Sequence, residues 1–214
     1  MLWRALSLCL LIFIGPGAAA AGSDLEYGIS VGAGGSWLDP ELADYRWDLD
    51  SRIHGLLEAD ARRGPWSLAL RLWRGSTTQG TGIPGSGPGP DVHLTGSELV
   101  ARFLLRQVGN TALSASLGGG RLHVGYAPDS LLLAPEGAPS PIRVDFDALD
   151  EWSLSYGLAL EQRFTGAMAL RLQMERMEFS LDTAHRNGGN IEERRDRFGN
   201  WMGRLSLTLF FGGD

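Results

Sequence analysis

The sequence predicts an all-β protein, an eight-stranded antiparallel up-and-down transmembrane β-barrel. Eight segments alternate apolar residues with small or polar ones at a period of two, as extended strands with two unlike faces do. The connections between these segments are alternately long and short, which would gather the long loops at one end of a barrel and the tight turns at the other. No segment shows the periodicity of a helix.

The first four strands are expected at residues 25–37, 52–62, 66–74 and 97–106. The first alternates large apolar residues with Gly and Ser, and it has aromatic residues near both ends, Tyr27 and Trp37. The second and third are joined by a tight turn at Gly64 and Pro65. Residues 75–96 are rich in Gly, Pro, Ser and Thr, a composition that disfavours regular structure, so they are expected to form a loop.

The last four strands are expected at residues 111–126, 151–162, 167–179 and 201–211. In the first of these the apolar parity inverts after Gly118, Gly119 and Gly120, which suggests a β-bulge there. Residues 127–150 and 180–200 are expected to be long loops. The last strand has the length that a tilted strand needs to cross a bilayer, and it should close the barrel by pairing with the first.

Composition limits the organisation and the partners of the chain. Its 214 residues are enough for one domain, and the net charge of −6 argues against a nucleic-acid partner. Residues 1–21 have the charged start, apolar core and small-residue end of a cleaved signal peptide, so residues 22–214 would be the barrel domain. Because Cys9 lies in the signal, the mature chain would have no thiol chemistry.

The content of the two strand faces decides which face is outside. The polar face is mostly Gly, Ser and Ala with isolated charges, which suits the crowded interior of a small barrel and not a water-exposed surface. The other face carries Leu, Ile, Val and Met with aromatic residues near the strand ends, as a lipid-facing surface does. The expected aromatic girdle is Tyr27, Trp37, Trp66, Trp152, Tyr156, Trp201 and Phe211.

This pattern of signal, strand count, loop alternation and aromatic-ended last strand resembles the small outer-membrane β-barrel family that includes OmpX, OmpW and the transmembrane domain of OmpA. The resemblance covers nearly the whole mature chain. It implies location in the outer membrane of a Gram-negative-type cell and insertion by the barrel assembly machinery, which recognises a terminal aromatic residue. Here Phe211 would be that residue, although Gly212, Gly213 and Asp214 follow it.

Charged residues on the small-residue face are predicted to lie in the lumen. They are Glu26, Glu58, Asp60, Arg71, Glu98, Arg102, Arg106, Glu161, Arg171, Glu175 and Arg204. Because burial of an unpaired charge is costly, they are expected to pair into a structural plug, with Arg204 bound to Glu26 or Glu58. The alternative is a narrow pore whose selectivity these charges set.

Other chemistry finds little support in the sequence. No nucleophile–base pair accompanies His54, His93, His123 or His185, so the protein is not expected to be an enzyme, although some barrels of this size modify lipid A. No catalytic residue, cofactor or metal site is predicted. The charged run at residues 192–197 is expected to be a solvated loop face, with binding of lipopolysaccharide phosphates as the alternative.

The sequence therefore predicts a monomeric outer-membrane barrel with a structural or surface-interaction role, in contact with outer-membrane lipid and lipopolysaccharide. A narrow porin for small solutes is the alternative, and a lipid A-modifying enzyme is less favoured.

Overall fold

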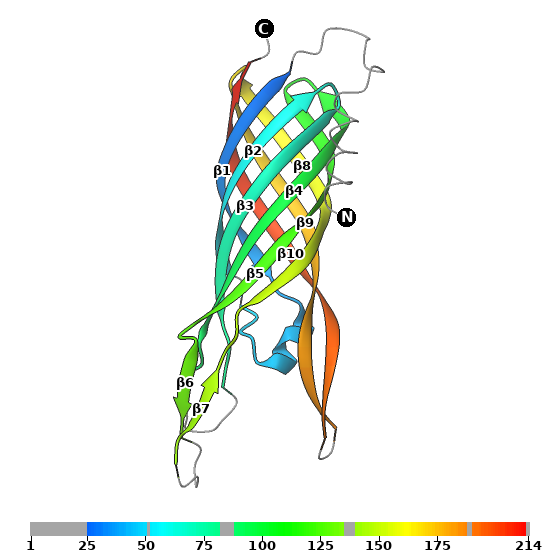
Figure 1. The fold of residues 1–214 in the computed structure, drawn as a ribbon. Helices are drawn as coiled ribbons and strands as arrows, with labels where there is room; N and C mark the ends of the chain where they lie inside the picture. Colours follow the sequence, from blue (N-terminus) through cyan, green and yellow to red (C-terminus); the bar gives the residue numbers. More distant parts are fainter. Residues whose placement is uncertain (1–24, 51, 82–87, 135–139, 188–189, 213–214) are drawn as a thin grey trace.

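The computed structural model describes residues 25–50, 52–81, 88–134, 140–187 and 190–212, and eight of its strands form a closed antiparallel barrel (Figure 1). The barrel strands are β1 (Glu26–Trp37), β2 (Arg52–Arg63), β3 (Trp66–Thr78), β4 (Asp91–Val108), β5 (Thr111–Ala127), β8 (Leu149–Thr165), β9 (Met168–Asn187) and β10 (Asn190–Phe211). Each strand pairs with its neighbours along the chain, and β1 closes on β10, so the predicted fold is confirmed. The predicted signal segment lies outside the described residues.

The short connections lie together at one end of the barrel, which we call the turn end (Figure 1). Tight turns join β2 to β3 and β4 to β5, and in each a glycine adopts a left-handed conformation, with φ of 57° at both Gly64 and Gly109. Residues with a Cβ rarely adopt this conformation, so glycine makes these reversals possible. β1 begins and β10 ends at this same end, and the long connections extend from the opposite end, the loop end.

The first and last strands pair over the whole length of β1. Tyr27 lies opposite Phe211 at the turn end, and Trp37 lies opposite Trp201 toward the loop end. The ten residue steps from Tyr27 to Trp37 measure about 33 Å along the strand, or about 25 Å along the barrel axis at a typical strand tilt. This height matches the apolar band of an outer-membrane barrel.

Several strands are longer than the hydropathy pattern predicted. β3 continues to Thr78 and β4 begins at Asp91, so the predicted loop at residues 75–96 is shorter than expected. The predicted loop at residues 180–200 is wrong, because β9 and β10 continue through it as a hairpin that protrudes beyond the loop end (Figure 1). The sequence of residues 180–200 shows no regular alternation of apolar residues, so its strands are recognised from the backbone pairing of β9 with β10.

The β-bulge predicted in β5 is absent. Gly118, Gly119 and Gly120 keep an unbroken register with β4, and the register shift between these strands lies instead between Leu104 and Arg106. The apolar residues of β5 lie on the outer face before the glycines and on the inner face after them. They change face because the lumen is apolar beyond the glycines.

The loop end carries additional structure within the predicted long connections. After β1, the 3-10 helix η2 (Pro40–Tyr45) is capped by Asp39, whose carboxylate accepts a hydrogen bond from the Glu41 amide at 3.0 Å. Between β5 and β8, the strands β6 (Ser130–Leu133) and β7 (Ile142–Asp145) form a small separate hairpin. In the described residues, no helix is long and apolar enough to cross a membrane.

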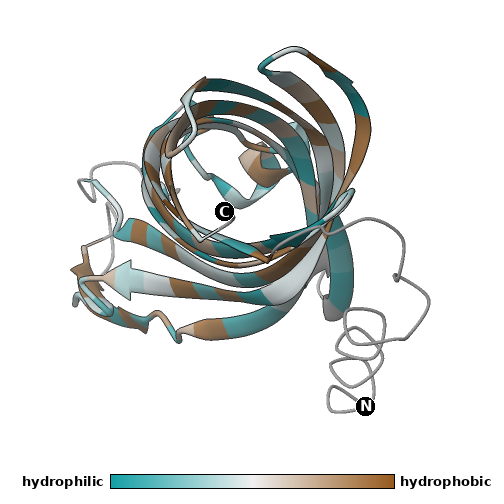
Figure 2. Ribbon diagram, turned by 90° about the horizontal axis from the view of Figure 1, so that it is seen from above, coloured by the Kyte–Doolittle hydropathy of each residue, from teal (hydrophilic) through white to brown (hydrophobic). Residues whose placement is uncertain are grey.

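Seen along the barrel axis, the strands form a complete ring in which hydrophobic and hydrophilic residues alternate (Figure 2). The outward positions of this ring carry the exposed large apolar side chains, among them Ile29, Leu70, Leu158 and Leu207. The inward positions carry the buried charges. The predicted apolar outer face therefore holds for the barrel wall, and the predicted polar inner face holds for its turn-end half.

Candidate functional site

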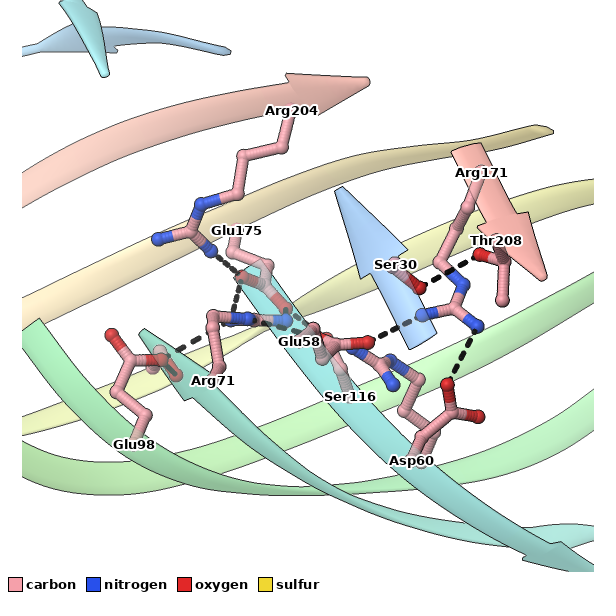
Figure 3. Close-up of polar contacts among 12 residues, drawn as sticks. Ser30, Glu58, Asp60, Arg71, Glu98, Ser116, Arg171, Glu175, Arg204 and Thr208 are labelled. Carbon is pink, nitrogen blue, oxygen red and sulfur yellow. Dashed lines mark hydrogen bonds and ion pairs between the residues drawn. The ribbon is translucent and has the colours of Figure 1, made fainter. Parts of the chain in front are cut away.

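Most of the predicted lumen charges are buried inside the barrel and lie close together (Figure 3). The buried members are Glu58, Asp60, Arg71, Glu98, Arg102, Glu161, Arg171, Glu175 and Arg204. They occupy the inward positions of β2, β3, β4, β8, β9 and β10, because alternate residues of a strand point to the same side. Glu26 is half-buried, and Arg106 is exposed.

Arg71 of β3 is the centre of the network. Its side chain is fully buried, and its guanidinium donates to Glu58 at 3.0 Å, to Glu98 at 3.1 Å and to Glu175 at 2.7 and 3.2 Å (Figure 3). Glu175 also accepts a hydrogen bond from the Ser116 hydroxyl at 2.9 Å. The charges of Arg71 and its partners are therefore compensated by direct, charge-assisted hydrogen bonds in a buried site.

Glu58 of β2 connects this centre to the turn-end half of the lumen. Besides Arg71 it accepts from Arg102 and Arg171, each at 2.5 Å. Arg171 also binds Glu161 at 3.0 and 3.1 Å. Three arginines on three different strands thus share one carboxylate, which ties β3, β4 and β9 to β2 across the barrel.

Arg204 of β10 binds a different acid from those predicted. Its guanidinium pairs with Glu175 on the adjacent strand β9, and its Nε lies 3.2 Å from Nε2 of His54. Glu26, one of the two predicted partners, instead binds Arg163 at 2.5 and 2.9 Å. The sequence could not identify the partner of Arg204, because the register between neighbouring strands determines which of their residues lie close together.

The structure differs from the prediction at Arg106. The register shift between Leu104 and Arg106 inserts one extra residue into β4, so strict alternation fails there and Arg106 lies exposed opposite Leu113. Two arginines that the pattern did not include, Arg62 and Arg163, join the network in its place.

Arg62 and Arg163 enclose an aromatic ring at the turn end. Their guanidinium carbons lie 4.4 and 4.2 Å from the centre of the Phe210 ring, which is almost fully buried between them. Arg62 is itself held by Glu161 at 2.6 and 2.7 Å and by Asp60 at 2.8 Å. Cation–π contacts of this kind, with both cations also ion-paired, stabilise the lumen near the end of β10.

Counting these additions, the described lumen network contains six carboxylates and six guanidiniums, so its formal charge is balanced. The acids are Glu26, Glu58, Asp60, Glu98, Glu161 and Glu175, and the bases are Arg62, Arg71, Arg102, Arg163, Arg171 and Arg204.

The loop-end half of the lumen is apolar, which the sequence analysis did not predict. Buried apolar side chains from the barrel wall meet those of the first long connection there. The members are Leu38, Leu42, Trp47, Leu56, Trp73, Val92, Leu94, Leu122, Val124, Met177, Phe179, Leu181, Phe198 and Met202. We call this cluster the apolar plug, and it adjoins the charged network where the Trp73 indole donates to Glu98 at 2.8 Å.

A polar cavity of about 470 Å³ opens at the turn end. The charged side chains that line it include Arg62, Arg102, Arg163 and Glu161. Buried polar atoms without a hydrogen-bond partner in the described residues include Nε and Nη1 of Arg102 and both amide atoms of Gln173. Such atoms are usual where ordered water completes a network.

The predicted girdle aromatics are all exposed on the outer wall. Tyr27, Trp66 and Phe211 lie at the turn end, and Trp37, Trp152 and Trp201 lie toward the loop end. Tyr156 lies midway along β8, where its hydroxyl donates to Glu178 at 2.8 Å.

Two of the histidines lie in different surroundings. His54 is buried beside Arg204 and Trp73, and His123 lies on the outer wall, 3.1 Å from Asp150. Among the described residues, no group of three His, Cys, Asp or Glu side chains is placed to hold a metal ion.

Comparison with known proteins identifies the fold. No protein-family model and no curated protein sequence matches the chain. Among solved structures, Ail of Yersinia pestis in complex with the heparin analogue sucrose octasulfate has a TM-score of 0.50, is 12% identical, and covers 88% of this chain and 99% of its own. Neisserial surface protein A has a TM-score of 0.51 at 9% identity, covering 89% of this chain and 98% of its own.

OprG of Pseudomonas aeruginosa also matches, with a TM-score of 0.50 at 12% identity, covering 89% of this chain and 98% of its own. At such identities the likeness concerns the fold alone. Together with the closed barrel, its exposed apolar wall and its charged lumen, these matches give the chain the fold of the small eight-stranded outer-membrane β-barrels.

Proposed function

We propose that this protein is an outer-membrane barrel with a closed lumen, and that its role is structural or is carried out by the hairpins beyond its loop end. The observation that carries the proposal is the filling of the lumen at two levels. The charged network crosses the barrel around Arg71, and the apolar plug closes the loop-end half. An eight-stranded barrel has an interior just wide enough for its own side chains, which fits this closure.

A narrow porin for small solutes is the alternative, and the turn-end cavity favours it. The cavity ends among the arginines of the charged network, however, and the apolar plug lies beyond them. An ion crossing the plug would lose hydration against apolar side chains such as Leu42, Val92 and Leu122, which are completely buried there.

Conductance in planar bilayers distinguishes the two. Purified protein is expected to insert without stepwise conductance, with a known porin in the same bilayer as the positive control. Reproducible unitary steps that scale with salt concentration would exclude the closed lumen and support the porin.

The loop end offers surfaces for interaction with other molecules. The β9–β10 hairpin and the β6–β7 hairpin extend beyond the barrel wall (Figure 1). On the first, the described arginines of the predicted charged run each lie near a carboxylate: Arg194 near Asp196 at 3.6 Å, Arg195 near Asp182 at 3.0 Å, and Arg197 near Glu178. This internal pairing supports the solvated-face interpretation of the run over binding of phosphates.

Location in the outer membrane is tested by fractionation and heat modifiability. A band in the outer-membrane fraction that migrates faster before boiling than after would support a folded membrane barrel. Recovery of the protein as a soluble periplasmic species would refute it. Cleavage of residues 1–21 is measured in the same sample by the mass of the mature chain.

The structural and interactive roles are separated by complementation. A deletion strain would receive the full-length gene or a gene in which β6–β7 and the end of the β9–β10 hairpin are replaced by short turns. If both restore detergent resistance, the barrel itself is sufficient; if only the full-length gene does, the hairpins are needed. A deletion strain with normal detergent resistance and an altered lipid A acyl profile would favour the less expected enzymatic role.

A further inference from the structure

We propose that the outer wall of β3, β4 and β5 near the loop end binds phosphate groups of an anionic outer-leaflet lipid through Arg74 and Arg121. We call Arg74, Thr95, Ser97, Arg121 and His123 the basic patch. The proposal rests on the proposed function in one respect, since it requires that this wall face an outer-membrane leaflet.

The sheet register places the members of the patch side by side. Arg74 of β3 lies opposite Thr95 of β4, which lies opposite His123 of β5. Ser97, two residues along β4, lies opposite Arg121. With neighbouring strands about 4.8 Å apart and residues about 3.3 Å apart along a strand, the Cα atoms of Arg74 and Arg121 are separated by about 12 Å. Two long side chains can therefore converge over the β4 hydroxyls.

Both arginines are exposed, and each lies between inward-facing neighbours. Trp73 and Leu122, the adjacent residues in the chain, belong to the apolar plug, so Arg74 and Arg121 face outward. Neither forms an ion pair or a hydrogen bond within the described chain. Arg121 contacts an aromatic ring instead, with its guanidinium carbon 5.0 Å from the centre of the Trp152 ring.

Within the patch, only His123 has a carboxylate partner, Asp150 of β8 at 3.1 Å, whereas most arginines of the loop end are paired. On the neighbouring loop-end surface, five described arginines each lie within 4 Å of a carboxylate. They are Arg143, Arg176, Arg194, Arg195 and Arg197. In β3, β4 and β5, which the structure describes completely, Asp91 at the start of β4 is the one acid on the outward face. The guanidiniums of the patch are thus free to bind an external anion.

The height of the patch matches a lipid headgroup. Arg74 is eight residues beyond Trp66, an aromatic at the turn end, so it lies about 20 Å above that level at a typical strand tilt. The apolar band of such barrels is about 25 Å high, so the arginine reaches the upper edge of the band. An arginine is tolerated there because the cost of a charged residue on the lipid face becomes small near the interface.

The chemistry of the patch fits a phosphate group better than a neutral headgroup. Guanidinium groups bind phosphate oxygens by strong, charge-assisted hydrogen bonds, and the hydroxyls of Thr95 and Ser97 supply further donors between them. The net charge of the chain is −6, so general attraction of anions would not explain such binding. A lipid phosphate also places acyl chains against the apolar wall below the patch, where Leu72 and Leu99 are outward neighbours.

The test is binding of bisphosphorylated lipid A to the full chain folded in a neutral detergent, measured by native mass spectrometry. The variants are Arg74→Gln, Arg121→Gln and the double variant. Arg143→Gln is the matched control, since Arg143 is an exposed loop-end arginine already paired with Asp145 at 2.7 Å. Each single variant is expected to bind lipid A about tenfold more weakly, as loss of one charged hydrogen-bonding group predicts. The control should bind like the wild type.

Three results would overturn the proposal: wild-type affinity in the double variant, equal binding of fully dephosphorylated lipid A, or displacement of lipid A by inorganic phosphate at similar concentration. The last would assign the patch to a soluble anion. Heat-modifiable migration of every variant shows that the barrel remains folded. A wild-type protein without heat modifiability would refute the membrane barrel itself, a failure separate from that of the patch.

Discussion

Replacing Arg71 with Met tests whether the charged network stabilises the barrel. Met removes the guanidinium while keeping an unbranched side chain in a position that is fully buried. Four hydrogen bonds to three carboxylates are lost. Glu58 keeps two arginines and Glu175 keeps Arg204, but Glu98 is left with two neutral donors, Trp73 and Ser155.

We expect the free energy of unfolding to fall by about 3–5 kcal/mol, the usual cost of removing one partner of a buried ion pair. The effect is large because Glu98 would remain buried without a compensating charge. Neutralising that acid should therefore recover part of the loss. In the double variant Arg71→Met/Glu98→Gln the combined destabilisation is expected to be smaller than the sum of the single effects, as coupled neighbours show.

The assay is equilibrium urea unfolding of the barrel in lipid vesicles, followed by tryptophan fluorescence and by heat-modifiable migration. The matched control is Gln173→Met. Gln173 is also buried in the lumen, but neither of its amide atoms has a hydrogen-bond partner in the described residues. An apolar replacement there is expected to change the free energy of unfolding by less than about 1 kcal/mol.

A loss below about 1 kcal/mol for Arg71→Met, or strictly additive effects in the double variant, would refute this reasoning. Either result would mean that the charges of the network are not coupled through Arg71 and are compensated individually, for example by water. Single ion pairs that are solvated in this way contribute little to stability.

Two further predictions concern the plug and the loop end. Gly96→Ala would place a Cβ 2.0 Å from the Trp73 indole nitrogen and should destabilise by about 1–3 kcal/mol, whereas Gly119→Ala, with no atom nearer than 3.8 Å, should be neutral in the same urea assay. Burial, assisted by the Asp196 carboxylate, raises the pKa of Tyr45 above its usual value of 10.0. Since the pKa is higher in the folded state than in the unfolded state, the contribution of Tyr45 to stability is complete below pH 10 and declines as the pH rises above it. Ultraviolet titration of the wild type and of Tyr45→Phe measures the ionisation of this side chain. A Tyr45 that ionises at its usual pH would contradict the packing.

The barrel itself could be predicted because its determinants are local. Period-two alternation defines each strand, as in Glu26–Trp37, and the tight turn at Gly64 marks its reversal. The prediction of a loop at residues 180–200 was wrong because strands formed there without the alternating pattern. The continuation of β9 and β10 to Asn187 and Asn190 lies in a stretch without regular alternation of apolar residues, so it is recognised only from backbone pairing.

The sequence predicted most of the charged residues that face the lumen, but it did not predict which of them pair with one another. Inward parity identified Arg71, Glu175 and the other central charges, but the pairing of Arg204 with Glu175 depends on the register between β9 and β10. Arg106 was assigned wrongly because a single extra residue in β4 reversed the parity beyond it.

The sequence by itself determined the eight barrel strands, their order, and over most of their length which face meets lipid, because alternation along a strand follows from the geometry of the extended backbone. The exception is β5 beyond Gly120, where Leu122 and Val124 face the lumen. Only the tertiary structure decided how the lumen is filled. Closure of the ring brings carboxylates of β2, β4 and β9 within hydrogen-bonding distance of Arg71 on β3. It also joins Leu42 of the first connection to Leu122 and Phe198 in the apolar plug. These contacts join residues far apart in the chain, and their formation requires the register and curvature of the whole barrel.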